Sequence, residues 1–147
     1  MSSTYVSLNV HIVFATKGRV PIIGESWIQD MHNYLGGTIR GLGATSLGVG
    51  GVADHVHLLA GLRGNQDVSE LVREIKKGSN HWAQEHHFPG FAWQGGYAAF
   101  SFAPKDLSSL RQYVASQKEH HHHRSSIDEL RELLLEAGLE INEQFFE

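Results

Sequence analysis

Two histidines, His55 and His57, stand two residues apart within a short apolar run. Residues at this spacing on a β-strand point to the same face of a sheet, so both imidazoles project together. Two convergent imidazoles are a natural pair of ligands for a divalent metal ion. The chain holds eleven histidines, so about one such pair is expected by chance. Two partly exposed strand histidines are therefore the competing interpretation.

Tyr113 and Gln117 form a second pair, four residues apart on a predicted helix, where they share a face. That face lies beside the apolar stripe formed by Leu107, Leu110 and Val114. A tyrosine at this boundary can present its hydroxyl to a cleft. A boundary tyrosine that packs its ring and exposes its hydroxyl to water is the commoner arrangement, so the pair alone does not decide between the two.

Arg73, Lys76 and Lys77 follow helical spacing and form the densest basic cluster at that spacing. Such a stripe can follow a phosphate backbone. Two nearby glutamates also fit a simple solvated helix face. Farther along, the histidine run 120–123 suits the C-terminus of a helix dipole, and His120 falls on the same stripe as Tyr113.

The elements that position these residues follow from hydrophobic periodicity and cap residues. The pattern predicts strands over 5–16, 45–52, 55–62 and 97–103, and helices over 27–42, 68–85 and 107–118. Ala53 and Asp54 form the turn of a hairpin, and Asp67 with Glu70 resembles a capping box. Ser126 is expected to cap a last amphipathic helix that ends at Gly138.

This order, β-α-β-β-α-β followed by two helices, is typical of an α+β fold of the ferredoxin-like class. We expect an antiparallel sheet with the helices on one face and additional C-terminal helices. The whole chain, 1–147, is expected to form a single domain in which 128–147 is an acidic C-terminal helix and tail.

Composition excludes several classes of protein. Cysteine is absent, so there is no disulfide framework, thiol nucleophile or cysteine-ligated metal site. No apolar stretch approaches the ~20 residues that cross a membrane, and the first residues do not resemble a signal peptide, so we expect a cytoplasmic protein. The net charge of −4 is uneven. Residues 128–147 carry seven acidic side chains against one arginine, which leaves the rest of the chain slightly basic.

Four segments, in order and each on its expected element, resemble the insertion-sequence 200/605 family of single-tyrosine HUH transposases. The resemblance extends over about residues 5–146, nearly the whole chain, and includes relatives associated with repeated palindromes. The matching segments are the following: His11 to Lys17; Asp54-His55-Val56-His57-Leu58-Leu59; Phe91 to Tyr97 leading into Phe100-Ser101; and Tyr113-x-x-x-Gln117 followed by Lys118 to His121.

The resemblance implies a function and a site. His55, His57 and Gln117 would hold a divalent cation, Mg²⁺ or Mn²⁺, and Tyr113 would attack a phosphodiester of single-stranded DNA. The products would be a 5′-phosphotyrosine and a free 3′-hydroxyl that can reverse the reaction on another strand. Family members are homodimers that recognise hairpin DNA. We expect the stripe of Arg73, Lys76 and Lys77 to hold that DNA, with His120 in an accessory role.

Two other classes of function remain open. One is a non-catalytic or domesticated protein that binds single-stranded or hairpin DNA, which formation of a covalent adduct would exclude. The other is a ferredoxin-like module whose histidines only hold a metal ion or a metabolite, which binding of hairpin DNA would exclude.

Overall fold

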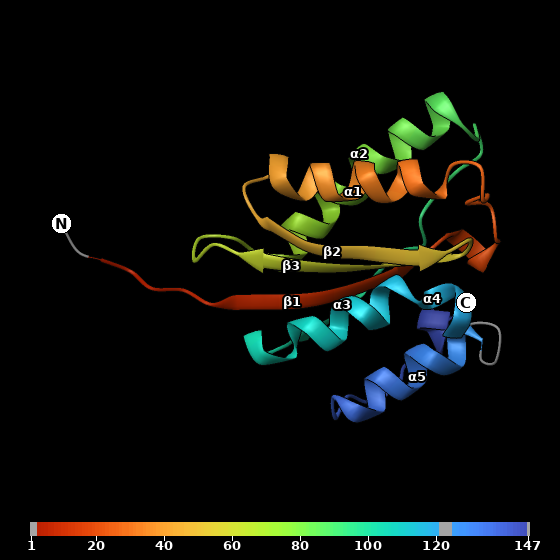
Figure 1. Cartoon of the computed structure of the whole chain (residues 1–147). Helices are drawn as coiled ribbons and strands as arrows, with labels where there is room; N and C mark the ends of the chain where they lie inside the picture. Colours follow the sequence, from red (N-terminus) through yellow and green to blue (C-terminus); the bar gives the residue numbers. More distant parts are fainter. Residues whose placement is uncertain (1–2, 121–124, 147) are drawn as a thin grey trace.

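The computed structural model describes residues 3–120 and 125–146. Its strands and α-helices alternate in the predicted order (Figure 1). They are β1 Leu8–Ala15, α1 Ile28–Gly41, β2 Thr45–Val52, β3 His55–Leu62, α2 Val68–His86, β4 Ala98–Ser101, α3 Leu107–Ala115, α4 Gln117–His120 and α5 Ser126–Glu136. Short 3-10 turns cover Lys17–Arg19, Pro104–Asp106 and Glu143–Phe146.

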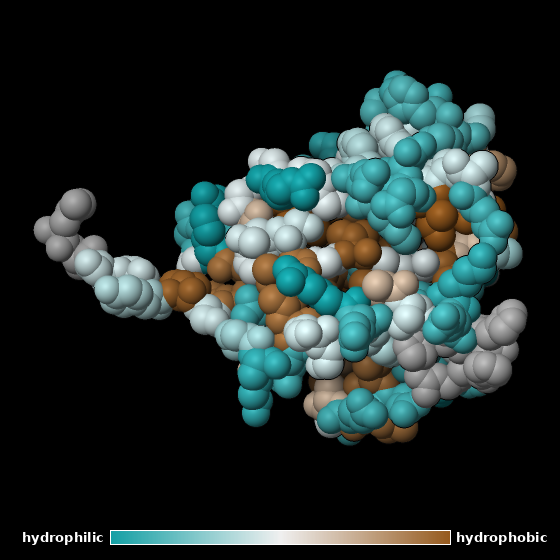
Figure 2. All heavy atoms as spheres, viewed as in Figure 1, coloured by the Kyte–Doolittle hydropathy of each residue, from teal (hydrophilic) through white to brown (hydrophobic). Residues whose placement is uncertain are grey.

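The four strands form one antiparallel sheet in the order β2-β3-β1-β4, which confirms the predicted fold class. The predicted bounds of β2 and β3 are confirmed. β1 begins at Leu8 rather than Tyr5, because the segment before it extends away from the body (Figure 1). Figure 2 shows apolar side chains at the surface where this segment leaves the body, and Val6 and Leu8 are indeed exposed.

The helices cover both faces of the sheet: the two helices of the β-α-β-β-α-β unit share one face, as expected, and the additional C-terminal helices cover the other (Figure 1). α1 and α2 lie on one side of the sheet, whereas α3, α4 and α5 lie on the other (Figure 1). Residues from His11 to Ala15 are therefore buried on both sides of β1. His11 is a polar residue between apolar ones in β1, a pattern typical of a strand residue that faces solvent, yet it is only 3% exposed because the α3–α5 layer covers it.

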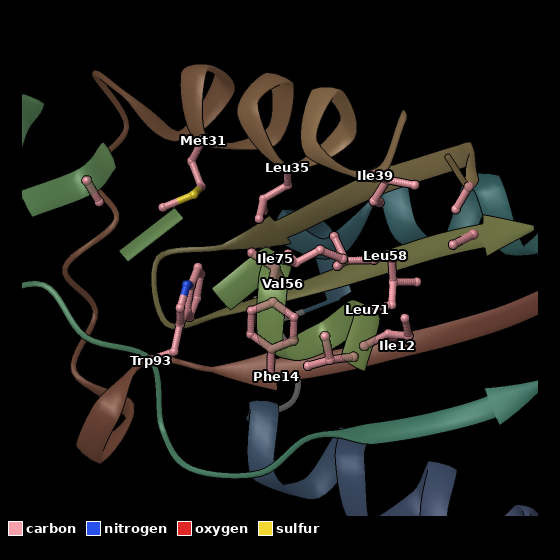
Figure 3. Packing of buried hydrophobic residues seen from close by; sticks show 14 of the residues in the cluster. Ile12, Phe14, Met31, Leu35, Ile39, Val56, Leu58, Leu71, Ile75 and Trp93 are labelled. Atoms are coloured by element: carbon pink, nitrogen blue, oxygen red, sulfur yellow. The ribbon is translucent and has the colours of Figure 1, made fainter. Parts of the chain in front are cut away.

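The main hydrophobic core fills the space between the sheet and the α1–α2 layer. Figure 3 shows side chains from β1 and β3 pointing toward side chains from α1 and α2. On α1 the large buried side chains recur every four positions, so they form one stripe facing the sheet. The labelled members are Ile12, Phe14, Val56 and Leu58 from the strands, Met31, Leu35 and Ile39 from α1, Leu71 and Ile75 from α2, and Trp93.

The structure confirms one predicted helix cap, corrects a second cap and divides one predicted helix in two. Asp67 caps α2 as predicted, since its carboxylate accepts from the backbone N–H of Ser69 at 2.8 Å. The cap of α5 is Ser125 rather than Ser126. The helix predicted over 107–118 is interrupted at Ser116, whose backbone N–H and hydroxyl both donate to the carbonyl of Gln112, at 3.0 and 2.7 Å; a serine bonded in this way often bends a helix.

Candidate active site

His55 and His57 lie at the start of β3 and project toward the α3–α5 layer, opposite to the apolar residues Val56 and Leu58. Their ring centroids are 5.1 Å apart. The two imidazoles therefore converge as predicted. They are 2% and 0% exposed, so the competing interpretation, partly exposed strand histidines, is wrong.

A carboxylate that the sequence analysis did not single out completes the cluster. Oε1 of Glu129, on α5, lies 3.0 Å from Nε2 of His57 and 3.6 Å from Nε2 of His55. The side chain is buried, and these three residues offer ligand atoms within 4.8 Å of one another, close enough to hold one metal ion. Glu129 precedes Leu133 by one helical turn, so it shares a side of α5 with an apolar residue. A carboxylate at such a position is the signal in the sequence that could have pointed to Glu129.

Gln117, at the start of α4, is also buried in the cluster. Its Oε1 lies 3.0 Å from Nε2 of His55, and its Nε2 donates to the carbonyl of Tyr113 at 3.3 Å. The break at Ser116 means that Tyr113 and Gln117 do not share one continuous helix. Both nevertheless reach the same site, since Gln117 contacts His55 and the ring of Tyr113 lies against His57.

Tyr113 lies in the last turn of α3, with its ring edge-on to the imidazole of His57 at 5.6 Å between centroids. A hydrogen bond from its hydroxyl is among the interactions that lower the pKa of Glu129. The tyrosine hydroxyl, two imidazoles and a carboxylate thus gather in one cluster, drawn from β3, α3 and α5.

Gly50 allows α3 to approach the sheet this closely. It pairs with His57 in the register of β2 and β3. A Cβ at this position would stand 2.1 Å from the carbonyl oxygen of Val114, the neighbour of Tyr113. A strand residue without a side chain is therefore required where α3 crosses, and this close contact brings Tyr113 beside His57.

The outer nitrogen of each imidazole has its own partner. Nδ1 of His55 lies 2.7 Å from Oδ1 of Asp54, and Nδ1 of His57 lies 2.8 Å from Nε2 of His11. Partners of this kind orient metal-ligating histidines. With a metal ion on Nε2 of His57, the proton of the neutral ring would sit on Nδ1 and be donated to His11.

Burial and hydrogen bonding set the charges of the metal-free cluster. Burial lowers the pKa of His55, but hydrogen bonds to Asp54 and Glu129 outweigh it and raise the pKa to about 9. Burial raises the pKa of Glu129, yet hydrogen bonds from His55 and His57 hold it well below its usual range. Burial, with the nearby His57, lowers the pKa of His11 to about 3, so His11 is neutral. A cationic imidazole therefore faces an anionic carboxylate, and a metal ion would displace the proton.

The cluster is closed by α5. The cavity between the sheet and this helix, lined by His55, Gln94, Glu129 and Leu130 among others, measures about 10 Å³. That is at most the room for one water molecule. A phosphodiester therefore reaches the imidazoles only if the contacts of α5 with the sheet open.

The basic stripe lies elsewhere. It is on α2, so the sheet separates it from the cluster (Figure 1). Arg73 is exposed and lies 3.5 Å from Glu70, and Lys77 is exposed. Lys76 is half-buried, and its Nζ donates to the carbonyls of Gln94 and Gly96. Burial lowers the pKa of Lys76 to about 8. Among the three residues of the stripe, only Arg73 and Lys77 have no hydrogen bond to a backbone carbonyl in the described part of the chain. The side chain of His120 and residues 121–123 lie outside what the structure describes.

Comparisons with known proteins agree with this picture. The family model described as "Transposase IS200 like" matches residues 4–117. A candidate transposase from Deinococcus radiodurans R1 superposes with a TM-score of 0.63 at 21% identity, covering 80% of this chain and 96% of that one. A REP-associated tyrosine transposase bound to a REP hairpin gives 0.61 at 18% identity, covering 82% and 73%.

The search of curated proteins found no match. Among the described residues, no helix is both long and apolar enough to cross a membrane. The two solved structures share the fold of this chain. The family model covers most of the chain, and its match includes Tyr113 and Gln117 but ends before α5. The chain belongs to the family of IS200-like transposases.

Proposed function

We propose that this transposase cuts and rejoins single-stranded DNA at hairpins, in a metal-dependent reaction, through a phosphotyrosine at Tyr113. The observation that carries the proposal is the convergence of the tyrosine hydroxyl with His55, His57 and Glu129 in one buried cluster. A purely structural cluster would not need two imidazoles whose inner nitrogens face a shared carboxylate.

The donor set fits a divalent cation. Two imidazole nitrogens and one carboxylate oxygen supply three ligands, and Gln117 places an amide oxygen beside them. Mg²⁺ prefers oxygen ligands, whereas Mn²⁺ accepts imidazole readily, so this set favours Mn²⁺ in vitro. When bound, such a cation would polarise the non-bridging oxygens of a phosphodiester and offset charge developing at phosphorus.

The residues of the chain orient the reacting groups. Asp54 and His11 hold the outer nitrogens of the two imidazoles, so the inner nitrogens face the site. The hydroxyl of Tyr113 is near enough to Glu129 to help lower the pKa of that carboxylate. Because the pKa of Glu129 is far below its usual range, this carboxylate is a poor base, and its role toward the hydroxyl is orientation.

The transfer itself is balanced without an external energy source. The phenolic oxygen of Tyr113 gives up its proton to water and forms a bond to phosphorus, and the bond from phosphorus to the 3′-oxygen of the neighbouring nucleotide breaks. That oxygen takes up one proton from water and leaves as a 3′-hydroxyl, so one proton is released and one is taken up. Attack by a 3′-hydroxyl of another strand on the phosphotyrosine reverses the step and restores the tyrosine.

Hairpin DNA is the proposed partner, and a homodimer is the proposed assembly. The solved relative bound to a REP hairpin supports a partner of this kind. Arg73 and Lys77 are the members of the α2 stripe proposed to contact phosphates, and Lys76 would join them only after leaving its carbonyl contacts. An exposed stripe remote from the cluster suits recognition of the hairpin rather than the cut itself.

Formation of a covalent adduct tests the function. The protein would be incubated with labelled single-stranded hairpins and Mn²⁺, and a protein–DNA band that survives denaturation would be sought. We expect a band for the wild type and none for Tyr113→Phe, which loses only a hydroxyl. Hairpin binding without an adduct would contradict cleavage. It would favour the non-catalytic DNA-binding protein, an alternative consistent with the closed site.

A further inference from the structure

The turn that follows β1 places Arg19 beside the cluster. Arg19 lines the same small cavity as His55 and Glu129, although it comes from a different segment of the chain. Its guanidinium carbon lies 5.6 Å from the centre of the Phe146 ring, which supports one face of the group. A positive charge is therefore held next to the proposed metal ligands.

Two donors of the guanidinium are left unsatisfied by the described residues. Within 3–120 and 125–146, Nε and Nη2 of Arg19 are buried and have no hydrogen-bond partner, and no other arginine there has a buried nitrogen in this state. These two nitrogens form one edge of the guanidinium, from which two N–H bonds point in parallel. That edge matches two oxygens of a phosphate or carboxylate.

The backbone holds Arg19 in this position at a conformational cost. Gly18 and Arg19 both adopt the left-handed region, with φ of 66° and 56°. A positive φ is uncommon for a residue other than glycine, and it persists only where the surroundings impose it.

Hydrogen bonds of Thr16 and its neighbour pin the turn on several sides. The N–H of Thr16 donates to the carbonyl of Asp54 at 2.9 Å, and its hydroxyl donates to the carbonyl of Val20 at 2.7 Å. The N–H of Lys17 donates to the carbonyl of Ala92 at 2.9 Å. The strain is thus maintained at a position that directs an unsatisfied guanidinium toward the cluster.

We propose that Arg19 is a phosphate-binding residue of the DNA site, whose Nε and Nη2 edge takes two oxygens of a phosphodiester in the single strand. The proposal rests on the proposed function, since it names the residue that holds the DNA backbone against the cluster. Two other basic side chains are already engaged, Lys76 with two carbonyls and Arg111 with the carbonyl of Leu47 at 2.6 Å.

Salt-dependent binding of a simple probe tests the role of Arg19. The probe is a fluorescein-labelled ten-nucleotide oligothymidylate, followed by anisotropy at increasing KCl concentration. We expect Arg19→Gly to bind about tenfold or more weakly at low salt, because a charge-assisted bidentate contact is lost. Its log–log salt slope should fall by roughly 0.7, the value for one phosphate contact with single-stranded DNA.

Two measurements distinguish this role from a structural one. Glycine tolerates a positive φ, so Arg19→Gly should melt at the same temperature as the wild type or above it. Arg40→Ala, which removes an exposed arginine from the end of α1 on the other face of the sheet, should leave the salt slope unchanged. A lower melting temperature together with a wild-type slope for Arg19→Gly would overturn the proposal.

The outcome is separable from that of the proposed function. A wild type that forms no adduct, but whose salt slope falls on Arg19→Gly, would remove the cleavage reaction and leave Arg19 as a phosphate-binding residue. Intact adduct formation with equal slopes for wild type and variant would overturn only the role of Arg19.

Discussion

The two faces of the sheet are built from alternate residues of the same strands, yet they bury different kinds of side chain. Toward α1 and α2, β1 and β3 present Ile12, Phe14 and Leu58 to a continuous apolar core. Toward α3 and α5 they present His11 and His57, which contact each other, and His57 also contacts the buried carboxylate of Glu129. On that second face, the apolar cluster formed by Val13, Ala98 and Leu130 is small.

The difference indicates which face stabilises the fold and which performs chemistry. Burying a leucine such as Leu58 contributes about 1.5–3 kcal/mol. Buried polar groups contribute little net stability even when they satisfy one another, and replacing them by apolar residues is often neutral. We therefore expect substitutions on the apolar face to affect unfolding, and substitutions on the polar face to affect metal binding and the tyrosine reaction.

The largest effect is expected from His55→Ala with His57→Ala. Removing both imidazoles should abolish measurable Mn²⁺ binding in calorimetric titration, because only Glu129 and Gln117 remain in the cluster and two ligands are too few to hold the ion. The matched control is His81→Ala with His86→Ala, two histidines of α2 that are 73% and 60% exposed. Undiminished affinity in the first variant would place the metal elsewhere, with the histidine run at 120–123 the next place to examine.

Leu58→Ala tests the opposite face at the adjacent position of β3. Leu58 is fully buried, so the substitution should lower the free energy of unfolding by about 3 kcal/mol in urea denaturation. The affinity of the folded variant for Mn²⁺ should stay near that of the wild type. A stable variant that lost Mn²⁺ would show that the two faces are not separable.

Gly50→Ala tests the contact that positions the tyrosine. The added methyl group would meet the carbonyl of Val114, so we expect α3 to shift and the free energy of unfolding to fall by about 2 kcal/mol. Adduct formation should fall further than stability accounts for. Gly95→Ala is the control, since nothing lies within 4 Å of its added carbon. Equal behaviour of the two variants would contradict the role of Gly50.

His11→Leu is expected to have the smallest effect. The substitution removes the partner of Nδ1 of His57, so Mn²⁺ affinity should fall about tenfold in calorimetric titration. His11→Gln retains a side-chain acceptor and should recover most of that loss. If leucine and glutamine gave equal affinities, His11 would fill space rather than orient His57.

Local patterns were enough to predict much of the fold. The bounds of β2 and β3, the cap at Asp67 and the convergence of His55 and His57 depend on residues close in sequence, and all are confirmed. Alternation and capping act over a few residues, so they can be read without knowledge of the tertiary structure.

The features that were missed depend on contacts between distant segments. His11 has the polarity of a solvent-facing strand residue, and only the packing of α3 and α5 buries it. Glu129 belongs to an acidic segment, and its role as a partner of His57 follows from the docking of α5. Lys76 has helical spacing with Arg73, but its ammonium group contacts carbonyls of the segment before β4.

Mapping the attached residue tests the central claim most directly. The protein would be incubated with hairpin DNA and Mn²⁺, digested with nuclease and protease, and the modified peptide sequenced by mass spectrometry. The account predicts a nucleotide phosphate on Tyr113 that disappears when the metal is chelated. Attachment at another residue, such as Tyr97, or an adduct that forms equally without metal, would contradict it.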